Sequence, residues 1–220
     1  MAAVASSYRV RPMTVGDIPQ VTEIERESFP TMWPQTAYKR ELQQNSMARY
    51  LVVGRPVPMA PVDPAQRPSG GLGGTVRSLR RMLRKELPSA EERGEQLAGF
   101  LGLWFMLEEC HIVTVAVREA LRRQGIGELL VITAVDLALR REQQVLTLEC
   151  RVSNTGAQAL YEKYAFERVG VRRRYYTDNN EDALIMTTPP IHTPDYRERF
   201  AHLRAVHAER WGAADLLLPD

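Results

Sequence analysis

One carboxylate in the second half of the chain lies where a side chain that moves protons could be expected. Glu149 occurs within Val145–Arg151, an apolar run whose alternation is typical of a strand. A carboxylate in a strand of this kind costs free energy unless it is paired or functional. Glu149 is therefore either a general base or a member of an ion pair, with Arg151 or Arg122 as the candidate partners.

A second stretch upstream has the order that binds phosphate groups. The β-branched run Ile112–Val117 predicts a buried strand, and a turn containing Gly125 and Gly127 leads into a helical segment, Glu128–Arg141. Glycine lets the backbone approach an anion, and the free N–H groups and dipole at a helix start attract negative charge. Neighbouring arginines, Arg122 and Arg123, add formal charge. The spacing fits neither the dinucleotide-binding fingerprint nor a Walker loop.

The glycine turn resembles the coenzyme A pyrophosphate loop of the GNAT acetyltransferase superfamily, through Arg122-x-x-Gly125-x-Gly127 after a Val-Ala-Val strand. Further blocks at 148–154 and 159–166 resemble the superfamily block that carries its proton acceptor and tyrosine. The end of the domain, 173–176 followed by 181–186, resembles the RimI type, the ribosomal-protein alanine N-acetyltransferases. The family often has asparagine where this chain has Arg174.

The resemblance implies an α/β fold of the GNAT kind: a mixed, mostly antiparallel central sheet that is splayed in the middle, with helices on both faces. It implies acetyl-CoA as co-substrate and no metal. Glu149 would be the general base. Tyr161, whose phenol has a pKa near ~10, would donate a proton to the leaving thiolate. The alternative for Tyr161 is a core tyrosine.

The resemblance also assigns binding residues on both sides of the reacting centre. The strand edge would hold the pantetheine arm, with the Val115 N–H polarising the thioester, and Asn154 would both cap a helix and contact the coenzyme. Phe29 and Trp33 would touch the acceptor, or else cap the core. A tyrosine pair would hold a peptide N-terminus, unless the adjoining arginines are simply a solvated strand end. The predicted coenzyme residues are Val115, Ala116, Val117, Arg122, Arg123, Gln124, Gly125, Ile126, Gly127, Glu128 and Asn154, and the predicted acceptor residues are Phe29, Trp33, Tyr175 and Tyr176.

Cysteine chemistry is not expected from this sequence. Cys150 alternates with Glu149, so its thiol should point away from the base, and no histidine lies nearby in sequence. Direct attack in a ternary complex is therefore favoured over an acetyl-enzyme. Cys110 and His111 are adjacent and should face opposite sides of a strand, which disfavours a zinc site. Two cysteines do not make a disulfide framework.

Composition places the chain among ordinary globular proteins. At 220 residues, 44% apolar and 25% charged, it can form one domain with a substantial core. A net charge of +2 gives no reason by itself to expect nucleic-acid binding. Neither a membrane-spanning run nor a signal peptide is evident, so a cytoplasmic location is expected.

The pattern predicts one domain over residues 1–190 with an insertion and a tail. The Pro/Gly-rich insertion, 55–96, contains a basic amphipathic helix, Thr75–Leu87, which could dock RNA or an acidic surface, or could fold back or stay mobile. The tail, 191–220, is predicted to be one helix. Strands are predicted at Tyr8–Arg11 (an edge or first strand), Arg49–Gly54, Leu97–Leu107, Glu109–Val117, Val145–Arg151, Phe166–Tyr176 and Ala183–Thr187, and helices at Ile18–Ser28, Thr36–Asn45, Glu128–Arg141 and Thr155–Tyr164.

The predicted reaction is acetyl transfer from acetyl-CoA to the N-terminal α-amine of a protein, with a ribosomal protein as the expected acceptor. An α-amine, with a pKa near ~8 against about 10.4 for lysine, is much more often deprotonated at neutral pH. Two alternatives stay open: acetylation of a lysine side chain or small amine, and a non-enzymatic coenzyme A-binding or RNA-docking module.

Overall fold

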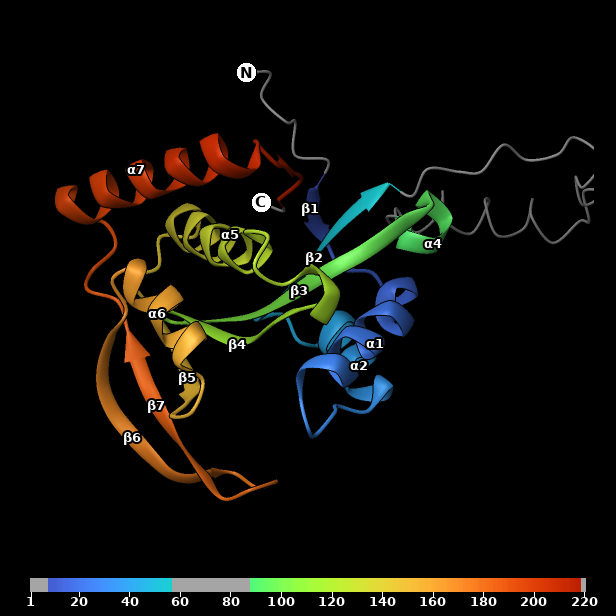
Figure 1. Ribbon diagram of the computed structural model, residues 1–220, viewed down its shortest axis with the longest axis horizontal. Helices are drawn as coiled ribbons and strands as arrows, with labels where there is room; N and C mark the ends of the chain where they lie inside the picture. The colour runs from blue at the N-terminus through green and yellow to red at the C-terminus, as the bar shows by residue number, and fades with distance from the viewer. Residues whose placement is uncertain (1–7, 57–87, 219–220) are drawn as a thin grey trace, which may run out of the picture.

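The computed structural model describes residues 8–56 and 88–218, and within them one mixed sheet organises the chain (Figure 1). Its eight strands lie in the order β6-β7-β5-β4-β3-β2-β1-β8. Most neighbours are antiparallel, and β4–β5 and β1–β8 are the parallel pairs. The predicted fold class is confirmed. The strands are β1 (Arg9–Pro12), β2 (Ala48–Pro56), β3 (Glu95–Met106), β4 (Glu109–Val117), β5 (Val145–Arg151), β6 (Glu167–Tyr176), β7 (Glu181–Thr187) and β8 (Asp215–Leu216).

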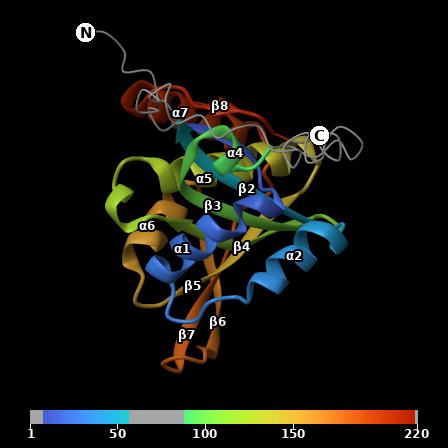
Figure 2. The ribbon, with the colours of Figure 1, turned by 90° about the vertical axis from the view of Figure 1, so that its right-hand side faces the viewer.

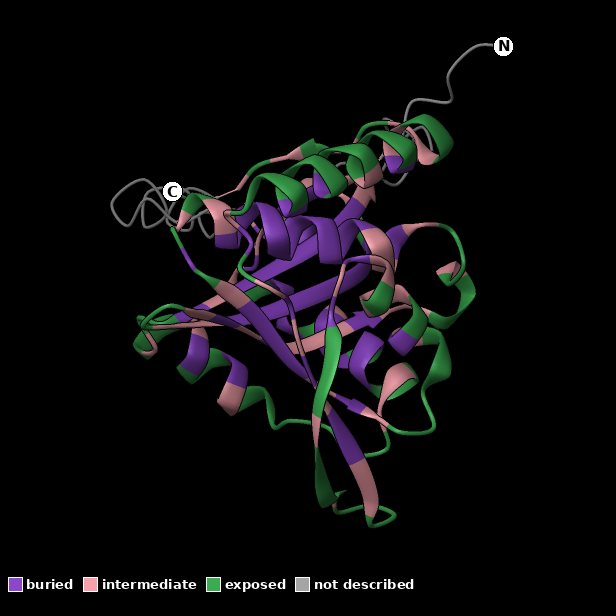
Figure 3. Ribbon diagram, turned by 90° about the vertical axis from the view of Figure 1, so that its left-hand side faces the viewer, coloured by how far each residue is buried: buried purple, intermediate pink, exposed green. Residues whose placement is uncertain are grey.

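Helices cover both faces of this sheet, as the sequence predicted (Figures 1 and 2). On one face α1 packs against β3 and β4, and α2 packs against β2. On the other face α5 packs on β3 and β4, and the mostly exposed α7 lies over α5 (Figure 3). The helices are α1 (Ile18–Ser28), α2 (Gln35–Gln44), α4 (Ala90–Arg93), α5 (Ile126–Arg140), α6 (Thr155–Lys163) and α7 (Pro194–Trp211), with short 3-10 turns η1 (Val15–Asp17) and η3 (Glu119–Leu121).

Each face has its own core, because the apolar side chains of the sheet alternate between two helical layers. The larger core lies under α5, which is apolar on almost every side and buries Leu130, Val131 and Leu137 completely. The smaller core lies under α1 and α2 and contains Val21, Ile24 and residues of β2 and β3.

The sheet opens in its middle, between β4 and β5. The two strands pair in parallel only from Glu109 opposite Val145 to Ile112 opposite Leu148. Beyond that point β4 continues to Val117 with β3 as its partner, and β5 continues with β7. The predicted splay therefore begins just after Ile112, and it leaves one edge of the second half of β4 without a strand partner.

The limits of the predicted insertion were wrong at both ends. The β2–β3 ladder continues to Pro56, which lies opposite Glu95, because antiparallel pairing holds the strands together past the composition change. A short helix, α4, precedes β3, and the Ala90 N–H donates to Asp17 Oδ1 at 2.6 Å. The predicted basic helix at 75–87 lies outside the described residues.

The tail is not a single helix. It forms α7 and then β8, which pairs in parallel with β1. Gly212, at φ 82°, ends α7 and lets the chain turn back towards the sheet. Of the two alternatives for Tyr8–Arg11, the first strand is confirmed and the edge position is wrong, since β1 lies between β2 and β8.

A buried ion cluster ties β1 to η1 and to the first residue of β3. The Arg11 guanidinium, 1% exposed at the side chain, lies 2.8 Å from Asp17 Oδ2 and 2.9 Å from Glu95 Oε2. Burial raises the pKa of Asp17, but the hydrogen bonds and charge of Arg11 and the N–H groups of Thr14 and Ala90 outweigh it, so the pKa lies below its usual value.

Candidate active site

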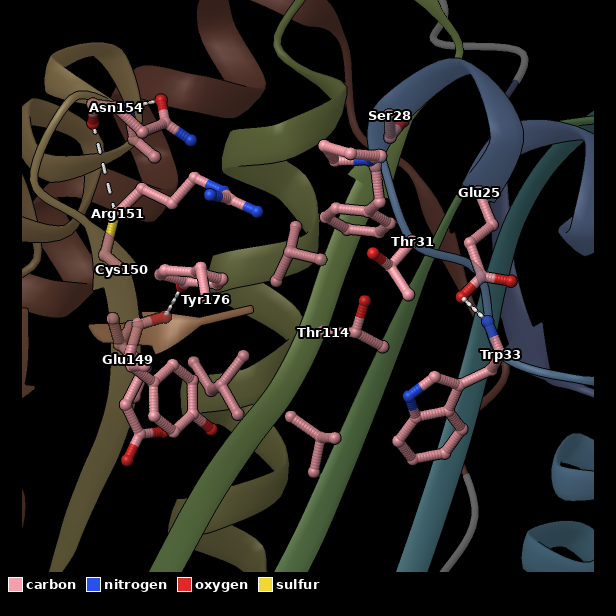
Figure 4. Close-up of a pocket in the computed structure, with 18 of the residues that line it drawn as sticks. Glu25, Ser28, Thr31, Trp33, Thr114, Glu149, Cys150, Arg151, Asn154 and Tyr176 are labelled. Carbon is pink, nitrogen blue, oxygen red and sulfur yellow. Dashed lines mark hydrogen bonds between the residues drawn. The ribbon is translucent and has the colours of Figure 1, made fainter. Parts of the chain in front are cut away.

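A pocket of about 480 Å³ lies where β4 and β5 separate (Figure 4). One wall comes from the end of α1 and the loop after it, and the other comes from β5, α6 and the end of β6. The structure brings all of the predicted catalytic and acceptor residues, together with two of the predicted coenzyme residues, to this pocket. These residues are Phe29, Trp33, Val115, Glu149, Asn154, Tyr161, Tyr175 and Tyr176.

Glu149 is held in this pocket by two basic side chains. Its carboxylate is 9% exposed, with Oε1 3.0 Å from Arg172 Nε and Oε2 3.2 Å from His111 Nε2. The ion pairs suggested by sequence are wrong, because Arg151 binds Asp178 and Glu181 instead. Glu149 is thus both paired and facing the pocket, and an ion pair does not exclude its use as a base.

His111 is one of the pocket residues that sequence reasoning missed. Its Nδ1 lies 2.8 Å from Thr147 Oγ1, and the Thr147 hydroxyl donates to Glu109 Oε1. The Thr147 oxygen is then left to accept from a protonated Nδ1. His111 Nε2 lies 3.2 Å from Glu149 Oε2. The four residues Glu149, His111, Thr147 and Glu109 therefore form a row of close polar contacts from the pocket to Glu109, whose side chain is 41% exposed.

No sequence signal identifies this row, because it depends on register. His111 lies opposite Thr147 in the short parallel stretch of β4 and β5, and a shift of one residue would turn the imidazole to the other face.

Tyr161 faces the pocket and also packs on the core. Its ring centroid lies 5.6 Å from that of Phe166, and burial followed by the charges of neighbouring groups raises its pKa above the ordinary value for a phenol. A phenol in this state keeps its proton at neutral pH. The position of Tyr161 is therefore compatible with both sequence interpretations, a core tyrosine and a proton donor.

Cys150 borders the same pocket as Glu149, but its Sγ lies 3.9 Å from the Asn154 carbonyl oxygen and points away from the Glu149 carboxylate (Figure 4). The pocket follows the edge of β5 beyond the splay, so residues from both faces of that strand border it. Burial raises the pKa of Cys150 to about 11. The thiol is therefore neutral near pH 7, which makes it a poor nucleophile.

The tyrosine pair stands at the mouth of the pocket. Tyr176 donates from its hydroxyl to the Glu149 carbonyl at 3.4 Å, and the Arg151 guanidinium stacks 3.8 Å from its ring centroid. Tyr175 packs edge-on against Tyr176 and is 45% exposed. Arg174 adopts a left-handed φ of 51°, a region in which asparagine is enriched, and its N–H donates to Asp182 Oδ1.

The glycine turn forms a helix start, away from the residues that line the pocket. Gly125 is the N-cap of α5 at φ 78°, a left-handed conformation that favours glycine. Arg122 and Arg123 are exposed, and Arg122 donates to the Glu27 carbonyl at 3.0 Å. The Glu128 carboxylate, predicted to lie at the coenzyme, is engaged by Lys163 and Tyr164.

The C-terminal helix, α7, packs against this turn. His207 Nε2 lies 3.0 Å from the Gly125 carbonyl oxygen, and a Cβ added to Gly125 would come within 2.7 Å of the Trp211 ring. A Cβ added to Gly127 would meet Val117 and Leu160 no closer than 3.7 Å. A larger residue at position 125 is therefore disfavoured both by the left-handed φ and by contact with Trp211. At position 127 the protein's own packing leaves room for a Cβ.

Asn154 caps α6 as predicted. Its Oδ1 accepts from the Ala157 N–H at 3.2 Å, which satisfies one of the free donors at the helix start. The remaining predicted coenzyme residues on β4, Ala116 and Val117, lie in the half of that strand beyond the splay.

The described residues contain no cluster of three or more histidine, cysteine or carboxylate side chains that could hold a metal ion. No helix in the same part of the chain is long and apolar enough to span a membrane.

The comparisons with known proteins agree with this geometry. The family model for the acetyltransferase (GNAT) family matches residues 79–166. A Bacillus subtilis (strain 168) protein, provisionally named ribosomal protein bS18-alanine N-acetyltransferase, is 34% identical over 177 residues, covering 80% of this chain and 92% of that protein. The Escherichia coli (strain K12) protein of that name is 38% identical over 96 residues, which are 43% of this chain and 65% of its own length.

Structural similarity shows the fold. The crystal structure of the ribosomal-protein-S18-alanine N-acetyltransferase from Escherichia coli aligns with a TM-score of 0.59 and 24% identity, covering 83% of this chain and 94% of that one. Together with the B. subtilis relative and the family model, these findings identify the chain as a member of the GNAT family of acetyltransferases.

Proposed function

We propose that the enzyme transfers the acetyl group of acetyl-CoA to the N-terminal α-amine of a protein, with the N-terminal alanine of a ribosomal protein as its acceptor. The observation that carries the proposal is that Glu149 and Tyr161 line one pocket at the splay between β4 and β5. The names of the relatives point to the acceptor. Such an acceptor would place the reaction in the cytoplasm.

Acetyl-CoA fits the two features that lead into this pocket. The unpaired edge of β4 beyond Ile112 offers backbone groups to the amides of the pantetheine arm, as an added strand would. The Gly125 turn and the N-terminus of α5 offer N–H groups and a positive dipole end to the diphosphate, with Arg122 and Arg123 nearby. The Asn154 amide, at the start of α6, borders the same pocket.

The chemistry would be a direct displacement. The neutral amine attacks the thioester carbonyl, a C–N bond forms, the C–S bond breaks, and the amine proton passes to Glu149. Tyr161 donates its proton to the leaving thiolate, and the Val115 N–H stabilises the oxyanion. With its proton on Nδ1, His111 has an Nε2 that can accept the proton from Glu149, and the contacts through Thr147 and Glu109 lead from there towards the surface.

An α-amine suits a base of this kind better than a lysine side chain does. Its pKa near ~8 leaves a substantial neutral fraction at pH 7, whereas lysine, near 10.4, leaves about two orders of magnitude less. The exposed Tyr175 at the pocket mouth gives a peptide backbone a hydroxyl to bond.

A panel assay with acetyl-CoA tests the proposal. The acceptors are a peptide with a free N-terminal alanine, the same peptide with a blocked N-terminus and an internal lysine, and a polyamine. We expect turnover on the first only. Turnover confined to the lysine peptide or the polyamine would replace the proposal with a side-chain or small-amine acetyltransferase. Failure of the enzyme to bind acetyl-CoA in calorimetry would refute the coenzyme assignment.

A further inference from the structure

The turn between β6 and β7 borders the pocket, although it has no apolar side chain of its own to pack there. Its residues, Thr177, Asp178, Asn179 and Asn180, are polar and exposed. Thr177 and Asp178 nevertheless line the pocket, next to the tyrosine pair. Because burial of apolar surface does not hold this turn, its position depends on polar contacts with the rest of the domain.

The ladder between β6 and β7 is interrupted at the tyrosine pair. Arg172 lies opposite Ala183, and pairing resumes with Tyr176 opposite Glu181. Between these two pairs, residues 173–175 of β6 face a single residue of β7, so regular pairing does not fix this part of the strand. Glu181 is therefore the residue through which β7 can hold Tyr176.

Arg151, the last residue of β5, reaches across to this point. Its Nη2 donates to Asp178 Oδ1 at 2.7 Å, and its Nη1 donates to Asn179 Oδ1 and Glu181 Oε2, both at 3.1 Å. The Arg151 side chain is 20% exposed, and its two carboxylate partners are similarly covered. A single exposed ion pair contributes little, but a partly buried guanidinium that bridges two carboxylates forms a network of defined geometry. Arg151 thus fixes the turn to β5.

Glu181 has a second anchor, which does not involve Arg151. Its Oε1 accepts from the Ser153 N–H at 2.7 Å. Hydrogen bonds from the hydroxyl and the N–H of Ser153 are the main cause that lowers the pKa of Glu181 to about 2, so this carboxylate is charged at neutral pH. A substitution of Arg151 leaves the bond to Ser153 in place, and the nearby start of α6 keeps its support.

The same guanidinium orients the tyrosine pair. It lies 3.8 Å from the ring centroid of Tyr176, whose hydroxyl donates to the Glu149 carbonyl at 3.4 Å. Tyr175 packs edge-on against Tyr176, with ring centroids 5.2 Å apart. Figure 4 shows Arg151 and Tyr176 next to each other on the β5 wall. A cation over the face of an aromatic ring is a directional contact, so it restricts the plane of the ring as well as its position.

We propose that Arg151 is a positioning residue for the acceptor: by holding the β6–β7 turn and the Tyr176 ring, it places both tyrosines where the peptide backbone has to pass. This inference rests on the proposed function, since it assumes a peptide acceptor. Among the described residues, the Arg151 side chain bonds the β6–β7 turn and Glu181, and not Glu149 or the glycine turn. Its loss should therefore affect the acceptor, and not the chemical step or the coenzyme.

Steady-state kinetics with a peptide that begins with alanine test the proposal, with acetyl-CoA at saturation. Arg151→Gln removes the charge and the stacked plane, so we expect KM for the peptide to rise about tenfold or more. The value of kcat should stay within about twofold, and the dissociation constant for CoA, measured by calorimetry, should not change. An unchanged KM for the peptide would overturn the proposal, and so would a fall in kcat at constant KM.

Arg151→Lys separates positioning from folding. Lysine can pair with one carboxylate, but it cannot bridge two carboxylates and stack as a plane. We expect this variant to keep the wild-type melting temperature while KM for the peptide is still raised about threefold or more. A wild-type KM in Arg151→Lys would show that charge alone is sufficient and would refute the proposed role.

Arg168→Gln is the matched control, because Arg168 lies on β6 and makes an exposed ion pair with Glu162 at 2.7 Å. Its KM for the peptide should be that of the wild-type enzyme. An equal rise of KM in Arg168→Gln and Arg151→Gln would mean that any loss of positive charge near β6 weakens the acceptor, and it would overturn the proposal.

A cycle of combined substitutions tests whether Arg151 acts through the tyrosines. In an enzyme that carries both Tyr175→Ala and Tyr176→Ala, the rings that Arg151 positions are absent. Adding Arg151→Gln to that enzyme should therefore raise KM for the peptide no further. A further rise as large as that in the wild-type background would overturn the proposal, because Arg151 would then act on the acceptor by another route.

The same assays distinguish failure of this inference from failure of the proposed function. If the wild-type enzyme acetylated a polyamine but not the alanine peptide, the proposed function would be refuted, and with it a role for Arg151 in holding a peptide. If the wild-type enzyme and Arg151→Gln acetylated the alanine peptide with equal KM, this inference alone would be refuted.

Discussion

His111 Nε2 lies 3.2 Å from Glu149 Oε2, and Glu149 Oε1 lies 3.0 Å from Arg172 Nε. Both oxygens of the proposed base therefore lie against basic side chains, one from β4 and one from β6. The second nitrogen of His111 bonds Thr147, so the orientation of the imidazole is fixed from both sides.

The first prediction concerns Glu149. Glu149→Gln keeps the shape of the side chain but cannot take the amine proton, so we expect kcat to fall about 10²- to 10⁴-fold. The dissociation constant for CoA, measured by calorimetry, should not change. An unchanged kcat would remove Glu149 from the role of base, whereas a large loss of CoA affinity would show that it supports binding instead.

The second prediction concerns the row behind His111. Thr147→Val is nearly isosteric and removes the hydroxyl that orients the imidazole, so we expect kcat to fall about three- to tenfold, with KM for acetyl-CoA unchanged. Thr133→Val is the control, because Thr133 is also fully buried but bonds only the Leu129 carbonyl within α5. Equal losses of kcat in the two variants would indicate general disruption of packing. That result would contradict a role for the His111–Thr147 contact in catalysis.

The third prediction separates the two glycines of the turn. Gly125→Ala places a Cβ at a left-handed φ and against Trp211, so both the melting temperature and the affinity for acetyl-CoA should fall. Gly127→Ala lies within α5 without a close contact, so the melting temperature should be equal or higher. Its affinity for acetyl-CoA should nevertheless fall if the diphosphate lies against this backbone. Wild-type affinity in Gly127→Ala would contradict that placement.

The fourth prediction concerns the C-terminal helix. His207 donates to the Gly125 carbonyl, so His207→Ala should loosen the turn and raise KM for acetyl-CoA about three- to tenfold with kcat unchanged. His202→Ala, at an exposed position of the same helix, is the control and should have wild-type kinetics. A fall in kcat without a change in KM would exclude the helix from positioning the turn.

The fifth prediction concerns stability at low pH. The pKa of Asp17 in the folded protein lies below its value of about 3.9 in an unfolded chain, so its stabilisation is complete above that value. As pH falls further, the unfolded state binds the proton first and the stabilisation is lost. Thermal unfolding between pH 7 and pH 3 should show a falling melting temperature.

Asp17→Asn tests the source of that acid sensitivity. Removing one partner of the buried cluster should cost about 3–5 kcal/mol at neutral pH and make the pH dependence shallower. Asp215→Asn, which removes an exposed pair with Arg9, should cost about 0–1 kcal/mol. A similar loss in both variants would mean that burial of the Arg11 cluster is not what makes it important.

Local chemistry in the sequence was sufficient for the elements and for part of the site. β-branched runs favour strands, glycine at 125 permits the left-handed cap of α5, and Asn154 caps α6 through an oxygen three residues before its donor. Alternation within Val145–Arg151 drew attention to Glu149 because a carboxylate in an apolar strand needs an explanation. These inferences depend on neighbours along the chain, so they could be made without a structure.

Only the tertiary structure decided what lies across from each of these residues. The pairing of His111 with Glu149 requires the β4–β5 register, the support of Gly125 by His207 requires α7 to fold back over α5, and the tail contributes β8 to the sheet. Each of these depends on groups brought together from distant parts of the chain, because a sequence gives the type and spacing of residues but not the pairing of strands or the packing of helices.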